Sequence, residues 1–171
     1  MNIDTYWHIL WTVYPMPMPN QQTKTISGLY DFYKKLEVDG IKYEVSQPLN
    51  ASTCTSNIKP DRPILNPHSV EDDIKKLTSE KGDRIAGNIP VIDLLVDSNH
   101  IELFVKFNGD NLIQKIARLK SRSATLLSFS SESGEGGKHT WSKGIWYGKS
   151  TDIRFVPLVK NRIMQLKNAS F

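Results

Sequence analysis

Apolar and polar positions in the first third of the chain predict a strand, a helix and a second strand. Residues 6–14 are mostly aromatic or β-branched and place Trp7, Ile9, Trp11 and Val13 on one face, a pattern typical of a strand that ends at the following prolines. Apolar residues at helical spacing behind Ser27 predict a helix over 27–38, closed by Asp39-Gly40. Residues 41–47 return to a strand pattern.

The middle of the chain predicts an irregular connection, a short helix and a β-hairpin. Residues 48–67 are rich in Ser, Thr, Asn and Pro, whereas Ser69 followed by Asp72 resembles a capping box and predicts a helix over 69–80. Residues 90–107 read as a hairpin with its turn at Ser98-Asn99, which sets Val96 opposite Ile101 and Leu94 opposite Leu103. Ile92 and Val105 join this apolar face, and the other face, which we expect to be solvated, carries Asp93, Asp97, His100, Glu102, Phe104 and Lys106.

Residues 111–122 form the most informative predicted helix. Leu112, Ile116 and Leu119 make a buried stripe, while the opposite side carries a polar row with three cations: Asn111, Lys115, Arg118 and Arg122. Lys120 falls off that row. Such a helix can dock on a sheet through its apolar stripe and lie along phosphates with its basic face.

The last third of the chain predicts mainly short strands. Residues 125–130 read as a strand, 131–138 as a glycine-rich loop, and 138–148 and 153–158 as further strands separated by turns. The remaining residues could form a frayed basic helix.

Composition places the chain among globular proteins. Its 171 residues are 39% hydrophobic, and no apolar run approaches the length of a membrane span. The single cysteine, Cys54, rules out a disulfide framework or a cysteine-based zinc site within one chain and suits a reducing compartment. No Lys or Arg precedes Lys24, so we expect no secretory signal, a cytoplasmic location and no membrane partner.

Charge is unevenly distributed. The formal net charge is +4, yet residues 1–105 hold 10 basic and 14 acidic side chains, whereas residues 106–171 hold 12 basic and 4 acidic ones. This basic segment also contains Trp141, Trp146, Tyr147 and Phe155, and aromatic rings beside cations commonly stack on RNA bases. A nucleic-acid partner is therefore expected for the C-terminal part.

Other candidate chemistries fit less well. Asp93, Asp97, Glu102 and Lys106 suggest a metal-dependent nuclease, but in that class the second carboxylate and the lysine stand two residues apart, and here they stand four apart. The glycine-rich loop lacks the Gly-Lys-Ser/Thr ending of a P-loop. The four histidines show no metal-ligand spacing.

Four stretches resemble one protein family. They are Tyr43-Glu-Val-Ser-Gln-Pro48, Ser69-Val-Glu-Asp-Asp-Ile-Lys-Lys-Leu77, the segment from Leu112 to Ser123, and Tyr147-Gly-Lys-Ser-Thr-Asp-Ile-Arg-Phe-Val-Pro157. In order and content they are similar to the CRISPR RNA-processing endoribonucleases of type I-F systems. The resemblance implies an α+β fold, with a ferredoxin-like part over 1–89 and an RNA-binding part over 90–171 that holds the basic helix and short antiparallel strands.

The resemblance implies a function for the basic helix. Family members bind the stem-loop of the CRISPR repeat, cut it at the 3′ base of the stem through the RNA's own 2′-hydroxyl without metal or other cofactor, and stay bound as a subunit of the CRISPR surveillance complex. The RNA repeat hairpin and the other subunits of that complex are then the expected partners. The implied RNA-binding residues are Lys106, Asn111, Gln114, Lys115, Arg118, Arg122, His139 and, stacking on the last base pair, Trp141.

The implied catalytic site departs from the family. The family's general-base histidine falls at Phe32 or Tyr33 here, so the implied catalytic set is Tyr33, Ser128 or Ser130, and Tyr147. An unperturbed tyrosine, with a pKa of about 10, is a poor base near neutrality. Three alternatives stay open: slow cleavage, cleavage by another group such as His139, or hairpin binding with catalysis lost.

Overall fold

The computed structural model describes residues 3–13, 26, 28–49, 64, 66–130 and 141–169, with the backbone alone for 127–130. The order of elements is β1 (Tyr6–Thr12), α1 (Leu29–Val38), β2 (Glu44–Val45), α2 (Pro67–Thr78), β3 (Val91–Val96), β4 (His100–Lys106), α3 (Leu112–Ser130), β5 (Trp146–Ser150) and α4 (Phe155–Ala169). None of the helices in this described part combines the length and apolar character needed to cross a lipid bilayer.

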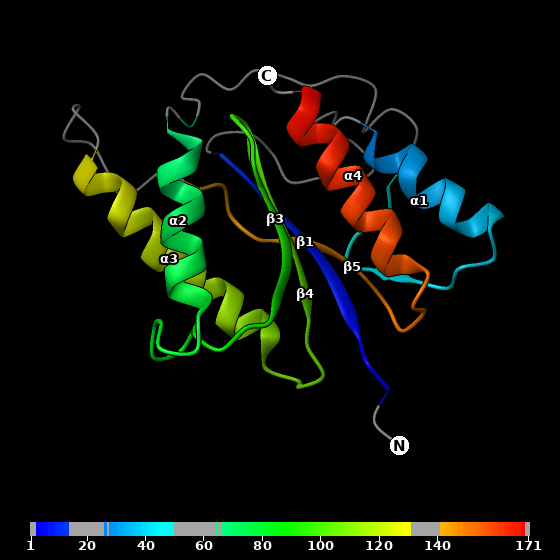
Figure 1. Ribbon diagram of the computed structural model, residues 1–171, viewed down its shortest axis with the longest axis horizontal. Helices are drawn as coiled ribbons and strands as arrows, with labels where there is room; N and C mark the ends of the chain where they lie inside the picture. The colour runs from blue at the N-terminus through cyan, green and yellow to red at the C-terminus, as the bar shows by residue number, and fades with distance from the viewer. Residues whose placement is uncertain are drawn as a thin grey trace.

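The strands form one antiparallel sheet in the order β2-β5-β1-β4-β3. The predicted α+β class is confirmed. Figure 1 shows three layers, with α2 and α3 on one face of the sheet and α1 and α4 on the other. The run β1-α2-β3-β4-α3-β5 has the β-α-β-β-α-β arrangement of ferredoxin-like folds. β1 and α2 of this run lie within residues 1–89, whereas β3, β4, α3 and β5 lie within residues 90–171.

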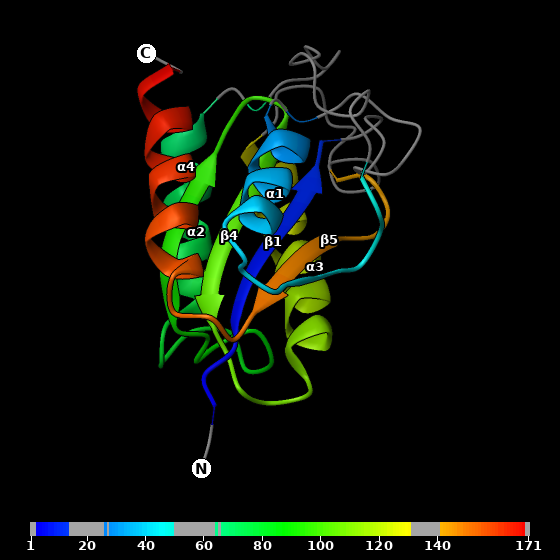
Figure 2. The same ribbon diagram turned by 90° about the vertical axis from the view of Figure 1, so that its right-hand side faces the viewer.

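β1 is the centre of the structure because it pairs with β4 on one side and β5 on the other. All its residues are buried. Trp7, Ile9 and Trp11 face α2 and α3, whereas Tyr6 and Leu10 face α1 and α4. Successive side chains of a strand point to opposite faces, so this strand contributes to two hydrophobic cores at once. Figure 2 shows β1 between β4 and β5.

Several predicted features are confirmed. In the hairpin, Val96 pairs with Ile101 and Leu94 with Leu103, as the pattern indicated. The helix predicted over 69–80 lies at Pro67–Thr78, where the Asn66 side chain accepts a hydrogen bond from the Ser69 amide and Pro67 occupies the first turn. Residue 66 rather than 69 is therefore the N-cap.

Two predicted strands are wrong. Residues 125–130 continue α3, and most of 153–158 belongs to α4. Pro157 and the β-branched residues near it favoured a strand, but Pro157 lies in the first turn of α4, where its missing N–H removes no helical hydrogen bond. The second predicted strand, 41–47, is shortened to Glu44–Val45.

The polar face of the hairpin is not solvated as predicted. His100, Glu102 and Phe104 are buried beneath the α1 and α4 layer. An irregularity between Val91 and Asp93 also shifts the register, so Ile92 packs with the α1 and α4 core instead of the apolar face assigned to it. The burial of His100, Glu102 and Phe104 was missed because no helix was predicted to pack over this face.

Candidate functional site

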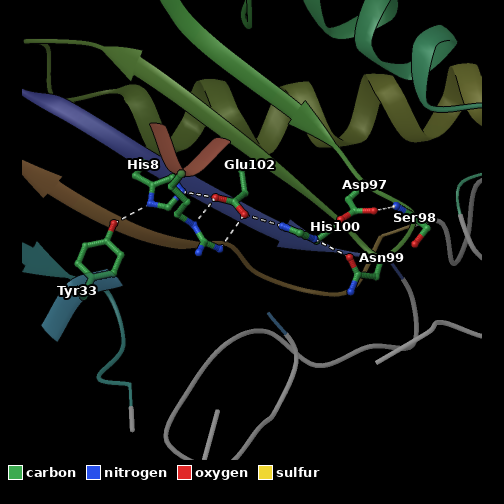
Figure 3. Close-up of polar contacts among 8 residues, drawn as sticks. His8, Tyr33, Asp97, Ser98, Asn99, His100 and Glu102 are labelled. Atoms are coloured by element: carbon green, nitrogen blue, oxygen red, sulfur yellow. Dashed lines mark hydrogen bonds and ion pairs between the residues drawn. The ribbon is translucent and has the colours of Figure 1, made fainter. Parts of the chain in front are cut away.

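A buried polar cluster lies between the sheet and helices α1 and α4 (Figure 3). Its centre is Glu102 on β4, which is 0% exposed. His8 Nε2 on β1 lies 2.6 Å from one carboxylate oxygen, and His100 Nε2 lies 2.7 Å from the other. Arg162 on α4 donates to both oxygens at 3.1 and 3.0 Å. Both oxygens of Glu102 thus have the hydrogen bonds that a carboxylate needs in the dry interior.

The cluster continues outward from both histidines. His8 Nδ1 lies 2.8 Å from the Tyr33 hydroxyl on α1, and His100 Nδ1 lies 2.6 Å from the side-chain oxygen of Asn99. Because Glu102 can only accept at His8 Nε2, a neutral His8 leaves Nδ1 as an acceptor, and the Tyr33 hydroxyl donates to it. Tyr33, His8 and Glu102 therefore form one hydrogen-bonded chain.

Burial sets the protonation states of this chain. Burial lowers the pKa of His8 and raises the pKa of the Tyr33 hydroxyl well above its usual value. Burial alone would raise the pKa of Glu102, but the Arg162 guanidinium and the two histidines outweigh it and hold that pKa well below its usual range. The cluster at neutral pH is an anionic Glu102 against Arg162, with a neutral His8 and a protonated tyrosine hydroxyl.

Gly148 on β5 makes room for this arrangement. A Cβ atom at position 148 would overlap the Tyr33 hydroxyl and ring. Within the Tyr147-Gly148 pair, the glycine therefore has a structural role, because the absence of a Cβ lets Tyr33 pack against the sheet.

The other predicted catalytic residues lie elsewhere. The backbone of Ser128 and Ser130 belongs to α3, on the opposite layer from Tyr33. Tyr147 also faces that opposite side, where its ring packs 5.0 Å from Trp7. The structure does not bring Tyr33, the two serines and Tyr147 together, and His139 lies outside the described residues.

The predicted basic row lies on the surface of α3 beside the connection from α2 to β3. Arg118 bonds Asp83 at 3.2 Å and Arg122 lies 3.4 Å from the same carboxylate, while Lys115 Nζ donates to the Gly87 carbonyl. The side chains of Arg118 and Arg122 are 39% and 42% exposed. Backbone amides of Ala86 and Ile85, together with Arg118, lower the pKa of Asp83 to about 2, so one fixed carboxylate faces two arginines.

Lys120 is confirmed to lie apart from this row. Its ammonium donates to the carbonyls of Ser142 and Gly144 at 2.9 and 2.6 Å, and burial lowers its pKa to about 8. Trp141 is tied to the same helix through a hydrogen bond from its Nε1 to Ser123. Both residues anchor the segment before β5 to α3.

The remaining predicted binding residues are surface groups. Asn111 and Gln114 are exposed at the start of α3, and Lys106 pairs with Asp4 at 3.0 Å. Of the hairpin carboxylates, Asp93 bonds Lys167, Asp97 bonds the Ser98 amide, and Glu102 is enclosed in the buried cluster. Within the described ranges, no group of three or more His, Cys, Asp or Glu side chains is arranged to hold a metal ion.

Sequence reasoning missed His8, His100, Glu102 and Arg162 as one cluster. One signal was present: His8 is a polar residue in a strand whose two faces are otherwise almost entirely apolar. Arg162 could not be assigned because the C-terminal residues were expected only as a frayed helix, with no packing against the sheet predicted for them. A scan against models of known protein families finds no match, and a search of curated proteins finds no match either.

Proposed function

We propose that this protein binds the stem of an RNA hairpin through α3 without cutting it, and that the hairpin is a CRISPR repeat, as the sequence resemblance implies. One observation carries the proposal. The basic row of α3 presents Lys115, Arg118 and Arg122 at one surface, and among the described side chains the salt bridges of this row go to Asp83 alone. The row therefore keeps an excess of positive charge.

The composition of α3 gives the row its charge. The connection from α2 to β3 carries two cations, Lys81 and Arg84, and two acids, Glu80 and Asp83, so its own charges cancel. α3 itself contains no Asp or Glu from Leu112 to Ser130. A rigid helix with cations in line and no carboxylate of its own is suited to phosphates along one side of a duplex.

Binding without cleavage fits the placement of Tyr33. Its hydroxyl is buried, donates to His8 and has a raised pKa, all of which oppose its action as a base. The groups expected to assist it lie on the other layer of the molecule. Hairpin binding needs only the surface of α3, and it makes no demand on the buried cluster.

Cleavage of the same hairpin is a second candidate, favoured by one contact. His8 of β1 brings an imidazole to 2.8 Å from Tyr33, close to the position at which the family carries its histidine on the first helix. This imidazole is 0% exposed, so cleavage would require α1 to move away from the sheet before RNA could reach it.

The test is binding of a labelled CRISPR-repeat hairpin in EDTA at several salt concentrations. We expect a stable complex and an intact RNA. Arg118→Gln with Arg122→Gln should weaken binding and reduce the slope of log affinity against log salt by about 1 for each phosphate that is no longer neutralised. A matched control is Lys35→Gln with Lys160→Gln, which removes two exposed cations from the α1 and α4 layer.

The outcomes separate the candidates. Equal weakening by the control pair, or no binding at moderate salt, would overturn the proposal. Cleavage that leaves a 2′,3′-cyclic phosphate and disappears in His8→Gln would establish the second candidate instead. A DNA hairpin of the same sequence measures how much of the affinity depends on the RNA 2′-hydroxyls.

A further inference from the structure

A cavity of about 160 Å³ lies between α1 and the segment around β2; it shares Tyr33 with the buried cluster and is lined by no residue of α3. Its walls are mostly aromatic and aliphatic, and its polar groups stand at one side. The lining residues are Tyr30, Tyr33, Lys34, Glu37, Tyr43, Val45, Pro48 and Leu49. An apolar pocket with a few convergent polar groups is the usual form of a small-molecule site.

The aromatic walls suit a flat ring. The rings of Tyr33 and Tyr43 have their centroids 4.9 Å apart and are tilted by 58°. Tyr30 lies on the α1 side, with Lys34 Nζ 5.7 Å from its ring centroid. Since these two rings contact each other, a base would stack on the half-buried ring of Tyr30 or Tyr43 rather than between Tyr33 and Tyr43. Bases that leave a helical stack are commonly stacked on aromatic rings and read along their Watson–Crick edges.

The polar side of the cavity is a lysine and a carboxylate next to each other. Glu37 accepts a hydrogen bond from Tyr43 at 2.7 Å through one oxygen and from Lys34 at 3.2 Å through the other. Each carboxylate oxygen has a further lone pair, and Lys34 has further N–H donors. The side chains of Lys34 and Glu37 are 52% and 50% exposed, so both can exchange water for a ligand.

We infer that this cavity binds guanine. Guanine places two parallel N–H donors, N1–H and the 2-amino group, beside the O6 acceptor. A carboxylate can accept both donors while an adjacent ammonium donates to O6, which is the pairing that Glu37 and Lys34 offer. Cytosine and adenine present only one amino donor on this edge, and uracil presents a single N–H between two acceptors.

Which molecule supplies the guanine depends on the proposed function, whereas the guanine site itself is inferred from the cavity alone. If the protein holds an RNA hairpin, the ligand is an unpaired guanine in the single strand that flanks the stem. The cavity lies beside β2, which is an edge strand of the sheet. A free guanine nucleotide would use the same contacts.

The first experiment measures binding of GMP, AMP, CMP and UMP to the full chain by calorimetry. We expect GMP to bind at least about tenfold more tightly than the others, and Glu37→Gln to reduce GMP affinity by about tenfold, since hydrogen bonds to a charged group are removed. Tyr43→Leu should weaken all four nucleotides. Asp31→Asn, an exposed acid on the same helix, is the control and should change nothing.

Equal affinity for the four nucleotides, no binding of any, or GMP affinity unchanged by Glu37→Gln would overturn the inference. A second arm compares hairpins whose 3′ flank carries one guanine or one uracil. Tighter binding of the guanine flank, abolished in Glu37→Gln, identifies RNA as the source, while GMP binding without a flank effect identifies a free nucleotide. Loss of hairpin binding in the Arg118→Gln and Arg122→Gln variant, with GMP binding intact, tests the proposed function separately.

Discussion

At the scale of single residues, Glu102 is the most demanding side chain of the interior. A carboxylate without exposure would be strongly destabilising in an apolar core unless opposite charge and hydrogen bonds surround it. Here Arg162 contacts both oxygens and the two histidines complete the shell. The stability of this core therefore depends on a complete set of partners rather than on any single contact.

Removal of the guanidinium should expose that dependence. Arg162→Met keeps much of the side-chain length but leaves Glu102 charged and short of two donors, so we expect a decrease of about 3–5 kcal/mol in the free energy of unfolding. Denaturant titration measures it, with the exposed Lys160→Met on the same helix as control. A decrease no larger than in the control would show that water enters the cluster and replaces the missing donors.

The cluster should also make stability depend on pH. His8 has a lowered pKa in the folded protein, so below its unfolded value near 6.5 the unfolded chain binds more protons and stability falls. Glu102, whose pKa is also lowered, adds a second decrease as the pH drops below about 4.5. Thermal melts from pH 7.5 to 4 should show both decreases.

A variant separates the two pH windows. His8→Gln retains an N–H donor for Glu102 but cannot titrate, so the decline between pH 6.5 and 5 should flatten while the decline below 4.5 persists. If the upper window is unchanged in this variant, the histidine responsible is not His8.

At the scale of elements, β5 and α1 are fitted to each other through Gly148 and Tyr33. Gly148→Ala places a methyl group against the tyrosine ring, which should destabilise the protein by about 1–3 kcal/mol. Tyr33→Leu removes the overlapping ring, so Gly148→Ala should destabilise much less in that background. Unfolding free energies of the two single variants and the double variant test this coupling. Additive effects would contradict it.

The same scale shows what a sequence can and cannot predict. The hairpin register was predictable because the turn and the apolar alternation agree on one pairing. The buried stripe of α3 was predictable because Leu112, Ile116 and Leu119 repeat at helical spacing. The first turn of α4 was not predicted, because the local signals at Pro157 and its neighbours favour a strand, and the residues after it were expected only as a frayed helix. Because the packing of this helix against the sheet was not predicted, neither the burial of His100 and Glu102 nor the role of Arg162 could be predicted.

At the scale of the molecule, the two faces of the sheet have different tasks. α2 and α3 cover one face and carry the basic row, while α1 and α4 cover the other and enclose the polar cluster. The tyrosine-lined cavity lies between α1 and the segment around β2. The charge imbalance along the sequence indicated a basic surface but not its position, since that depends on how α3 packs beside α2.

This division predicts where RNA will contact the chain. Ultraviolet crosslinking of the bound hairpin, followed by mass spectrometry, should mark peptides from residues 81–88 and 111–126. A flank with an unpaired guanine should add crosslinks to Tyr30 or Tyr43. Crosslinks confined to α4 would place the RNA on the wrong layer and contradict the binding surface.

The closed set of contacts around Glu102 also constrains how this sequence can change over generations. Each of His8, His100, Glu102 and Arg162 satisfies another member, so replacement of one leaves a buried charge or donor without its partner. A lineage can leave this arrangement only by exchanging several members together, for instance Glu102 and Arg162 for apolar residues of similar volume. Across relatives, the four positions should therefore change as a group, and their joint identity would mark descent more clearly than any surface motif.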